Sequence, residues 1–200
     1  GYILTLLEGG LEDSSVNKKF LKRASKGVER MNKIIMDLDM ISRFESDRIN
    51  MDFRENNIVE ICEEIIESLE LKAKEYSTEL SLAKNYDNPI LVNCDKDKIG
   101  QVIQNLLINS IKYSEKNSEV IIRFTDFESN LLIEVEDNGL GINESHINRL
   151  FERFYRVDKS RARNEGGTGL GLSIVKHIIE AHGHNVQVRS MEGEGSTFFF

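Results

Sequence analysis

Residues that break helices and residues that cross-link small folds are both scarce in this sequence. Its 200 residues include one Pro, two Cys and no Trp. Cys62 and Cys94 lie far apart and form neither a C-x-x-C nor a His-Cys pattern, so we expect two reduced, buried thiols rather than a metal or redox site. With 40% hydrophobic and 30% charged residues, the composition excludes a disordered or collagen-like chain and favours a helix-rich globular protein.

Long apolar runs are missing as well. No stretch approaches the roughly 18 residues that crossing a bilayer requires, and residues 1–8 show neither a basic leader nor a small-residue cleavage site. The chain has no initiator Met and begins within an apolar pattern, so we expect a soluble piece of a longer protein.

Acidic side chains outnumber basic ones, and the formal net charge is -8. Residues 1–52 carry as many basic as acidic side chains, so the whole excess falls on the rest of the chain. An acidic domain without a broad basic face gives no reason to expect nucleic-acid binding. The change in charge and pattern divides the chain into two regions, 1–50 and 51–200.

The first region predicts a helical hairpin. Leu4 and Leu7 belong to the end of one helix, which stops at Gly9-Gly10. Asp13 or Ser14 can cap the next helix.

That second helix is expected from Val16 to about Phe44, without a breaker. Its narrow apolar stripe favours a bundle formed with a second copy of the chain, although the stripe could instead pack on the domain that follows. The stripe residues recur three or four apart: Phe20, Ala24, Val28 (or Gly27), Met31, Ile35, Leu38 and Ile41.

The second region alternates between helical and strand patterns, which suggests a two-layer α/β sandwich. We expect helices over 58–76 (capped by Asn57), 95–113, 144–150 and 169–182, and strands over 79–83, 90–94, 120–126, 131–137, 186–190 and 197–200.

Polar side chains line one face of the predicted helix over 95–113. Asn105, Asn109 and Lys112 follow one another at i, i+4 and i+7, opposite apolar positions. Amide oxygens are hard ligands that suit Mg²⁺, and an ammonium group beside them suits a phosphate chain. The same pattern could also be an ordinary polar helix face.

Two glycine motifs follow. In the first, Asp137 ends a strand, and Gly139 and Gly141 permit a tight turn. A buried carboxylate there could accept a hydrogen bond from an exocyclic amine such as that of adenine, although simple strand-ending turns are common.

The second glycine motif, over residues 166–171, leads into an apolar helix. Free backbone amides and a helix N-terminus then point at the same space, which predicts a phosphate site. The glycines do not follow a strand, and no Gly-Lys-Ser/Thr is present, so neither a dinucleotide fold nor a Walker loop is expected.

Between the two glycine motifs lies a basic segment over residues 150–163. It could be a solvated loop, but its cations and its two phenylalanines favour a mobile lid. We expect Phe151 and Phe154 to anchor that lid to the core, and Arg153, Arg156 or Arg161 to supply its charge.

The order of these motifs resembles the N, G1, F and G2 boxes of the catalytic ATP-binding domain of sensor histidine kinases in bacterial two-component systems. The resemblance extends to residues 38–45, which look like the end of that family's dimerisation helix, and to 193–198, which look like its closing strand. It implies an α+β fold: a GHKL-type two-layer sandwich with a mixed sheet (the Bergerat ATP-binding fold) over 51–200, preceded over 1–50 by a hairpin, truncated in its first helix, that forms a dimeric four-helix bundle.

The resemblance also implies a role for each motif residue. Asn109 would ligate Mg²⁺ with Asn105 beside it, and Asn105 and Lys112 would take part in catalysis. The expected ATP-binding residues are Asn105, Asn109, Lys112, Tyr113, Asp137, Gly139, Gly141, Arg156, Gly167, Thr168, Gly169, Leu170 and Gly171.

The sequence departs from the family at the phosphoacceptor. The family carries a histidine on the first helix of the hairpin, whereas the first histidine here is His146. We expect surface or packing roles for His146, His177, His182 and His184. The missing acceptor indicates either truncation, which we favour, or an acceptor region that is disordered or omitted.

The implied function is the cytoplasmic kinase core of a sensor anchored in the bacterial inner membrane through upstream segments. It would bind ATP and Mg²⁺, transfer the γ-phosphate to an upstream histidine, and pass it to an aspartate of a response-regulator receiver domain. The alternatives are a GHKL-type ATPase and a degenerate, non-enzymatic dimerisation or relay module.

Overall fold

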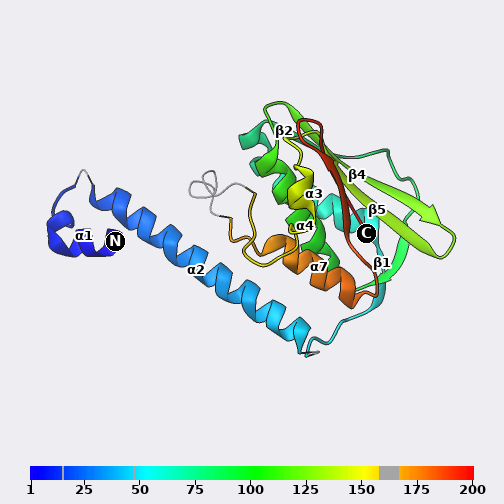
Figure 1. Cartoon of the computed structure of the whole chain (residues 1–200), viewed down its shortest axis with the longest axis horizontal. Coiled ribbons are helices and arrows are strands. Elements are labelled where there is room, and N and C mark those ends of the chain that lie inside the picture. The colour runs from blue at the N-terminus through cyan, green and yellow to red at the C-terminus, as the bar shows by residue number, and fades with distance from the viewer. Residues whose placement is uncertain (15, 47, 158–166) are drawn as a thin grey trace.

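The computed structural model describes residues 1–14, 16–46, 48–157 and 167–200. Figure 1 shows a long helix, α2, that extends from an N-terminal turn to the edge of a mixed α/β domain. In the described ranges, none of the helices combines the length and the hydropathy that spanning a bilayer demands.

The N-terminal region is a helical hairpin, as expected. A short helix, α1 (Tyr2–Thr5), continues as a π-helical turn, η1 (Leu6–Gly10), and α2 (Asn17–Glu45) packs back against it. Gly9 ends the first arm with a φ of 113°, a left-handed conformation that glycine adopts without strain.

The expected cap of α2 was wrong. The N-cap residue is Val16, which makes no side-chain capping bond, and not Asp13 or Ser14. The helix begins at Asn17, next to the expected Val16, and residues 13–16 are still turning: the backbone carbonyl of Asp13 accepts hydrogen bonds from the amides of Val16 and Asn17.

The described part of the chain that follows α2 has two layers. Its five-stranded sheet has the order β2-β4-β5-β7-β6, in which only β2 and β4 are parallel among the described strands. The strands are β2 (Thr78–Leu82), β4 (Ser118–Phe127), β5 (Asn130–Asp137), β6 (Gln187–Met191) and β7 (Gly195–Phe199).

The second layer consists of α3 (Ile58–Tyr76), α4 (Lys96–Tyr113) and α7 (Gly171–Ala181), with α4 in the middle (Figure 1). A short helix, α5 (Glu144–Ile147), follows β5 and is shorter than expected. The mixed sheet covered by helices confirms the predicted α+β fold.

A second, two-stranded sheet joins β1 (Arg54–Asn57) to β3 (Leu91–Cys94). The sequence did not predict β1, because its four residues are polar and show no apolar alternation. Asn57 ends β1 and caps α3, since its side chain accepts a hydrogen bond from the amide of Val59.

The core lies between the sheet and the helical layer. Ile103, Leu107 and Ile111 of α4 are fully buried, as are Ile122 and Val135 of the sheet. Each such side chain contributes ~1.5–3 kcal/mol to stability through removal of apolar surface from water. Because α4 is held on both sides, its polar face has a fixed position.

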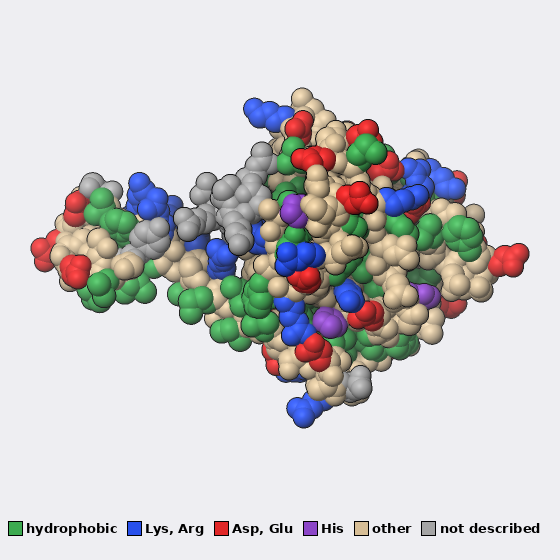
Figure 2. Space-filling model, viewed as in Figure 1, with side chains coloured by type: hydrophobic (Ala, Val, Ile, Leu, Met, Phe, Trp, Pro, Cys, Tyr) green, Lys and Arg blue, Asp and Glu red, His purple; other side chains and the backbone are tan. Residues whose placement is uncertain are grey.

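The apolar stripe of α2 divides between two environments. Leu38 and Ile41 pack on the α/β domain, and Ile41 is fully buried there. Val28, Met31 and Ile35 remain 50%, 61% and 62% exposed, and Figure 2 shows apolar side chains on the surface of the extended N-terminal arm. The alternative that the stripe packs on the following domain therefore holds for its C-terminal part.

Candidate functional site

The Asn-bearing face of α4 meets the start of α7. A Cβ added to Gly171 would stand 3.4 Å from the Oδ1 atom of Asn105, so the glycine lets the amide lie close to the helix N-terminus. The Nδ2 atom of Asn105 is buried and has no hydrogen-bond partner among the described atoms. An unsatisfied buried donor costs ~1–3 kcal/mol, so this position suits a ligand that brings an acceptor.

Asp137, at the end of β5, is a buried carboxylate. Its Oδ2 accepts a hydrogen bond from the hydroxyl of Ser110 at 3.1 Å, and its Oδ1 accepts one from the amide of Gly139 at 3.1 Å. Burial raises the pKa of Asp137, while these hydrogen bonds act in the opposite direction. Each carboxylate oxygen keeps capacity for a further donor.

The turn after Asp137 touches the end of α4 so closely that only glycine fits. A Cβ on Gly139 would lie 2.7 Å from the carbonyl oxygen of Tyr113, and the amide of Leu140 donates to that same oxygen at 3.2 Å. Gly141 has a φ of 64°, and its Cβ would stand 1.8 Å from the carbonyl oxygen of Met191. The first glycine motif is thereby attached to α4.

The second glycine motif leads into α7. Leu170, the N-cap residue, makes no side-chain capping bond, so no capping side chain accepts a hydrogen bond from the first backbone amides of α7. Thr168 accepts a hydrogen bond on its Oγ1 from the amide of Leu170 at 3.3 Å. Leu170 itself is fully buried, so only its backbone can serve a ligand. The arrangement suits an anion.

Three further candidates lie on the same side of α4. Asn109 and Lys112 are half-buried, one and two turns beyond Asn105, and Tyr113 ends the helix with a 42% exposed side chain. In the described residues, no group of three or more His, Cys, Asp or Glu side chains could hold a metal ion. A cation would therefore depend on amide oxygens and on oxygens that a ligand brings.

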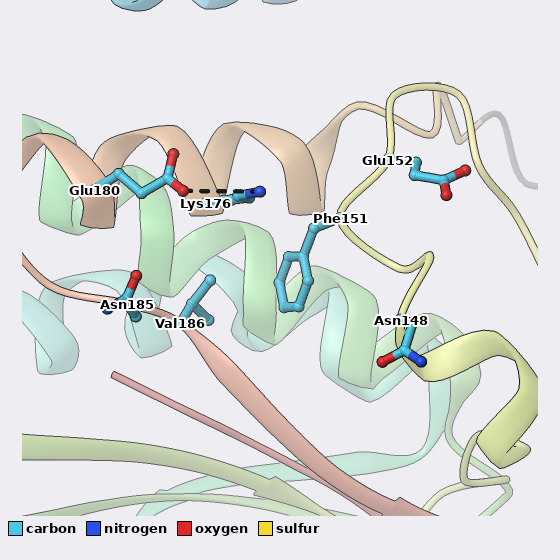
Figure 3. Close-up of a pocket in the computed structure, with 7 residues that line it drawn as sticks. All are labelled: Asn148, Phe151, Glu152, Lys176, Glu180, Asn185 and Val186. Atoms are coloured by element: carbon cyan, nitrogen blue, oxygen red, sulfur yellow. Dashed lines mark ion pairs between the residues drawn. The ribbon is translucent and has the colours of Figure 1, made fainter.

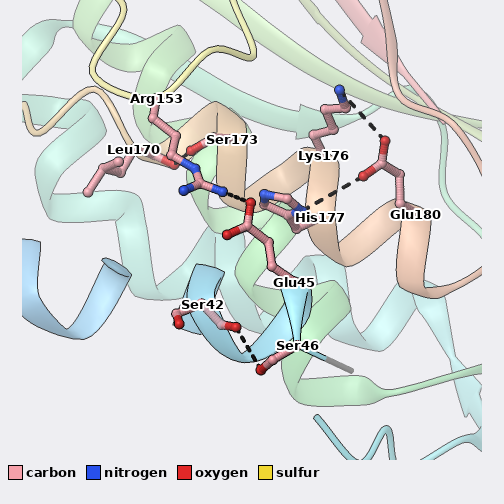
Figure 4. Close-up of polar contacts among 9 residues, drawn as sticks. All are labelled: Ser42, Glu45, Ser46, Arg153, Leu170, Ser173, Lys176, His177 and Glu180. Carbon is pink, nitrogen blue, oxygen red and sulfur yellow. Dashed lines mark hydrogen bonds and ion pairs between the residues drawn. The ribbon is translucent and has the colours of Figure 1, made fainter. Parts of the chain in front are cut away.

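The arginines of the basic segment have different partners. Arg156 donates to the carbonyl oxygen of Gly167 at 2.7 Å, so its guanidinium group lies at the glycine loop. Arg153 instead forms an ion pair with Glu45 of α2 (Figure 4). Arg161 lies outside the described residues.

Only one of the two expected anchors of the lid is buried. Phe151 packs against the core cluster, whereas Phe154 is 54% exposed, so the expectation for Phe154 was wrong. The reason is local: Phe154 has a φ of 61° and donates its amide to the carbonyl of Gly169 at 2.9 Å. The backbone, not the ring, makes this connection.

A hollow of about 300 Å³ lies on the other side of α7 (Figure 3). Phe151 and Val186 form its apolar part, and Lys176 and Glu180 form an ion pair beside it at 3.7 Å. None of the residues expected to bind ATP lines this hollow, so it is separate from the candidate site.

The four histidines take packing or surface positions. His177 stacks on Phe44, and burial lowers its pKa. His182 accepts the amide hydrogen of Asp95 on Nε2 at 3.2 Å, and His146 contacts the hydroxyl of Tyr155 at 2.6 Å. His184 is exposed.

Two groups of residues at the site were not predicted from the sequence. Ser110, which holds Asp137, was assigned to no role although it is a small polar residue on the buried side of α4. Arg30 and Asp37 of α2 reach the glycine loop, and no sequence signal could have found them, because 130 residues or more separate the partners.

Known proteins are similar to this chain in sequence. A family profile described as histidine kinase-, DNA gyrase B- and HSP90-like ATPase matches residues 94–200. The sensor histidine kinase WalK of Bacillus subtilis is 36% identical over 202 residues, which cover all of this chain and 33% of WalK. The chain thus spans about a third of the length of that relative.

Solved structures are similar as well. The catalytic domain of histidine kinase ThkA, in a nucleotide-free form, superposes with a TM-score of 0.64 and 29% identity over 75% of this chain and 94% of that one. The Acinetobacter baumannii histidine kinase AdeS superposes with a TM-score of 0.73 and 25% identity over 98% of this chain and 92% of that one.

Proposed function

The chain belongs to the family of histidine kinase-, DNA gyrase B- and HSP90-like ATPases, and we propose that it is the ATP-binding kinase core of a two-component sensor histidine kinase. The observation that carries the proposal is the meeting of Asn105 with the start of α7, which joins the polar face of α4 to an anion site. Asp137 lies beside the same helix further along, where Ser110 of α4 donates a hydrogen bond to it.

The nucleotide is proposed to lie between these two positions. Asp137 accepts a hydrogen bond from the adenine amine, next to the turn formed by Gly139 and Gly141, with Tyr113 at its rim. The amides of residues 167–171 receive the phosphates, together with the Thr168 hydroxyl and the guanidinium group of Arg156.

The residues present fit a magnesium ion held together with a triphosphate. The oxygens of Asn105 and Asn109 are ligands of the kind that Mg²⁺ prefers, and the unpartnered Nδ2 of Asn105 can donate to a phosphate oxygen. When bound, the ion neutralises charge on the phosphates. Lys112 adds a cation on the same helix face, so Asn105 and Lys112 position the phosphates for transfer.

We further propose that residues 1–50 form a dimerisation hairpin and residues 51–200 the catalytic domain. Val28, Met31 and Ile35 follow one another along α2 and are largely exposed, as are Leu7 in the first arm and Leu11 just after it. A second copy of the chain would bury this surface in a four-helix bundle.

The phosphate acceptor is proposed to be a histidine upstream of Gly1, because none of the four histidines here lies at the glycine loop. From that histidine the phosphate passes to an aspartate of a response-regulator receiver domain. The remaining part of the full-length protein would then hold the membrane anchor and the sensor.

Nucleotide titration tests the proposal. The chain should bind Mg-ATP in preference to Mg-GTP, and Asp137→Asn should weaken ATP binding at least tenfold, while Asp126→Asn, at an exposed position of β4, should leave it unchanged. Equal binding of ATP and GTP, insensitive to Asp137, would refute the site. Steady ATP hydrolysis without phosphoprotein in a longer chain would favour an ATPase instead.

A further inference from the structure

Helix α2 contacts the glycine loop at the start of α7. The guanidinium group of Arg30 donates to the carbonyl oxygen of Gly167 at 3.2 Å, and the hydroxyl of Thr168 donates to the Oδ2 atom of Asp37 at 3.5 Å. These bonds connect α2 to the loop that the proposed function assigns to the phosphates, so the inference below rests on that function.

The contact belongs to a larger interface. Ile41, one turn beyond Asp37, is fully buried against the α/β domain. At the end of α2, Glu45 pairs with Arg153, and Phe44 stacks on His177 with 6.2 Å between the ring centroids (Figure 4 shows the Glu45–Arg153 pair). The apolar contacts hold α2 in place, and the polar ones set its register against the loop.

Asp37 is the acidic group of this interface. The residue is only 8% exposed, and its carboxylate points to the loop. Burial raises its pKa, whereas the nearby charge of Lys33 and the hydrogen bond from Thr168 lower it. A carboxylate that is buried and only weakly hydrogen-bonded can be displaced at little cost.

A triphosphate conflicts with this carboxylate. Phosphates bound at Thr168 would place like charge beside Asp37 and would compete for the same hydroxyl group. With adenine at Asp137, the terminal phosphate extends furthest along the site toward α2. ADP lacks that phosphate and carries less charge, so it conflicts less.

We propose that Asp37 is a sensor of the γ-phosphate: its carboxylate holds the glycine loop on α2 when ADP or no nucleotide is bound, and ATP displaces it. By linkage, the factor by which docking of α2 weakens ATP binding equals the factor by which ATP weakens docking. ATP thereby frees the catalytic domain to move along α2, and ADP returns it to the docked state.

Affinities of Mg-AMPPNP and Mg-ADP, measured by calorimetry, test the charge of Asp37. Asp37→Asn keeps an acceptor for Thr168 but removes the negative charge. We expect AMPPNP to bind about fivefold to twentyfold more tightly to this variant and ADP to change by less than about twofold, as removal of one nearby charge at a solvent-screened site implies. Asp39→Asn, on the exposed face of the same helix, is the matched control and should change neither affinity.

Hydrogen exchange tests the docking itself. In the wild-type chain and in Asp39→Asn, AMPPNP should raise amide exchange over residues 34–44 relative to ADP. In Asp37→Asn, which keeps the acceptor for Thr168, both nucleotides should give the low exchange that ADP gives in the wild type. This readout separates a sensor from a residue that only stabilises the interface, since the loss of a merely structural contact would raise exchange with both nucleotides.

The outcomes distinguish the two proposals. The sensor proposal fails, and the nucleotide site stands, if the wild type binds both nucleotides and Asp37→Asn leaves the ratio of AMPPNP to ADP affinity unchanged. Weaker AMPPNP binding in that variant would have the same meaning. A wild-type chain that binds neither nucleotide would overturn both.

Discussion

Ser110 donates a hydrogen bond to Asp137 at 3.1 Å, and both residues are buried. This bond joins the inner side of α4 to the end of β5 and sets the direction of the carboxylate. The position of the proposed adenine anchor thus depends on a residue that need not touch the nucleotide.

Ser110→Ala should therefore reduce both stability and nucleotide binding. We expect a loss of ~1–2 kcal/mol in the free energy of unfolding, because a buried acceptor loses its partner. Urea denaturation and ATP titration check the two effects. Ser68→Ala, whose hydroxyl donates to a carbonyl oxygen on the exposed side of α3, serves as the control and should change neither by much.

Asp137→Asn should gain stability as the pH rises, relative to the wild type. Burial raises the pKa of Asp137, so the native state holds its proton to higher pH than the unfolded state does. The stability of the wild type therefore falls as the pH rises through the interval between the unfolded and native pKa values, and the neutral amide escapes this loss. Urea titrations at pH 4 and pH 7 measure the difference in the free energy of unfolding between Asp137→Asn and the wild type. If that difference is the same at both pH values, the raised pKa of Asp137 is contradicted.

Gly141→Ala should be severely destabilising. The new Cβ would meet the carbonyl oxygen of Met191 at 1.8 Å, and the backbone has a φ of 64°. We expect a loss of more than ~3 kcal/mol. Gly193→Ala separates the two causes, because Gly193 has a φ of 84° but open space around it, and a loss of ~1 kcal/mol is expected there. Thermal melts would contradict this account if the two variants lost equal stability.

The exposed stripe of α2 should hold two chains together. Met31→Glu with Ile35→Glu would place charges in the proposed bundle, so the chain should become monomeric in analytical ultracentrifugation. Leu71→Glu is a matched control, since Leu71 is 79% exposed on α3 and lies outside the stripe. A wild-type chain that is already monomeric at high concentration, or a double variant that remains dimeric, would refute the bundle.

The sequence predicted the helices and strands of the α/β domain well, because local patterns determine them. Asn57 caps α3, and the expected strands over 120–126 and 131–137 pair as the hairpin of β4 and β5, each one residue longer at the turn. The sequence did not predict the polar strand β1, because its pairing with β3 is a tertiary property. The start of α2 lies within one residue of the expected Val16, but the expected capping residue was wrong because backbone turns, not a side-chain cap, precede the helix.

The candidate site was predictable to the extent that each motif carries its own signal. Asp137 and the glycines were found from turn chemistry, and Asn105 from helical spacing. Ser110, Arg30 and Asp37 could not be found this way, since their roles arise from packing between elements that are distant in sequence. For Phe154 the prediction from residue type was wrong. Its ring was expected to pack into the core, but its backbone amide forms the contact, with the carbonyl oxygen of Gly169.

The most direct test of the central claim is incubation with γ-labelled ATP of a chain extended at its N-terminus, with the 200-residue chain as the control. The account predicts acid-labile, alkali-stable label on the extended chain alone, as expected of phosphohistidine. If neither chain is labelled although both bind Mg-ATP, the kinase assignment is contradicted.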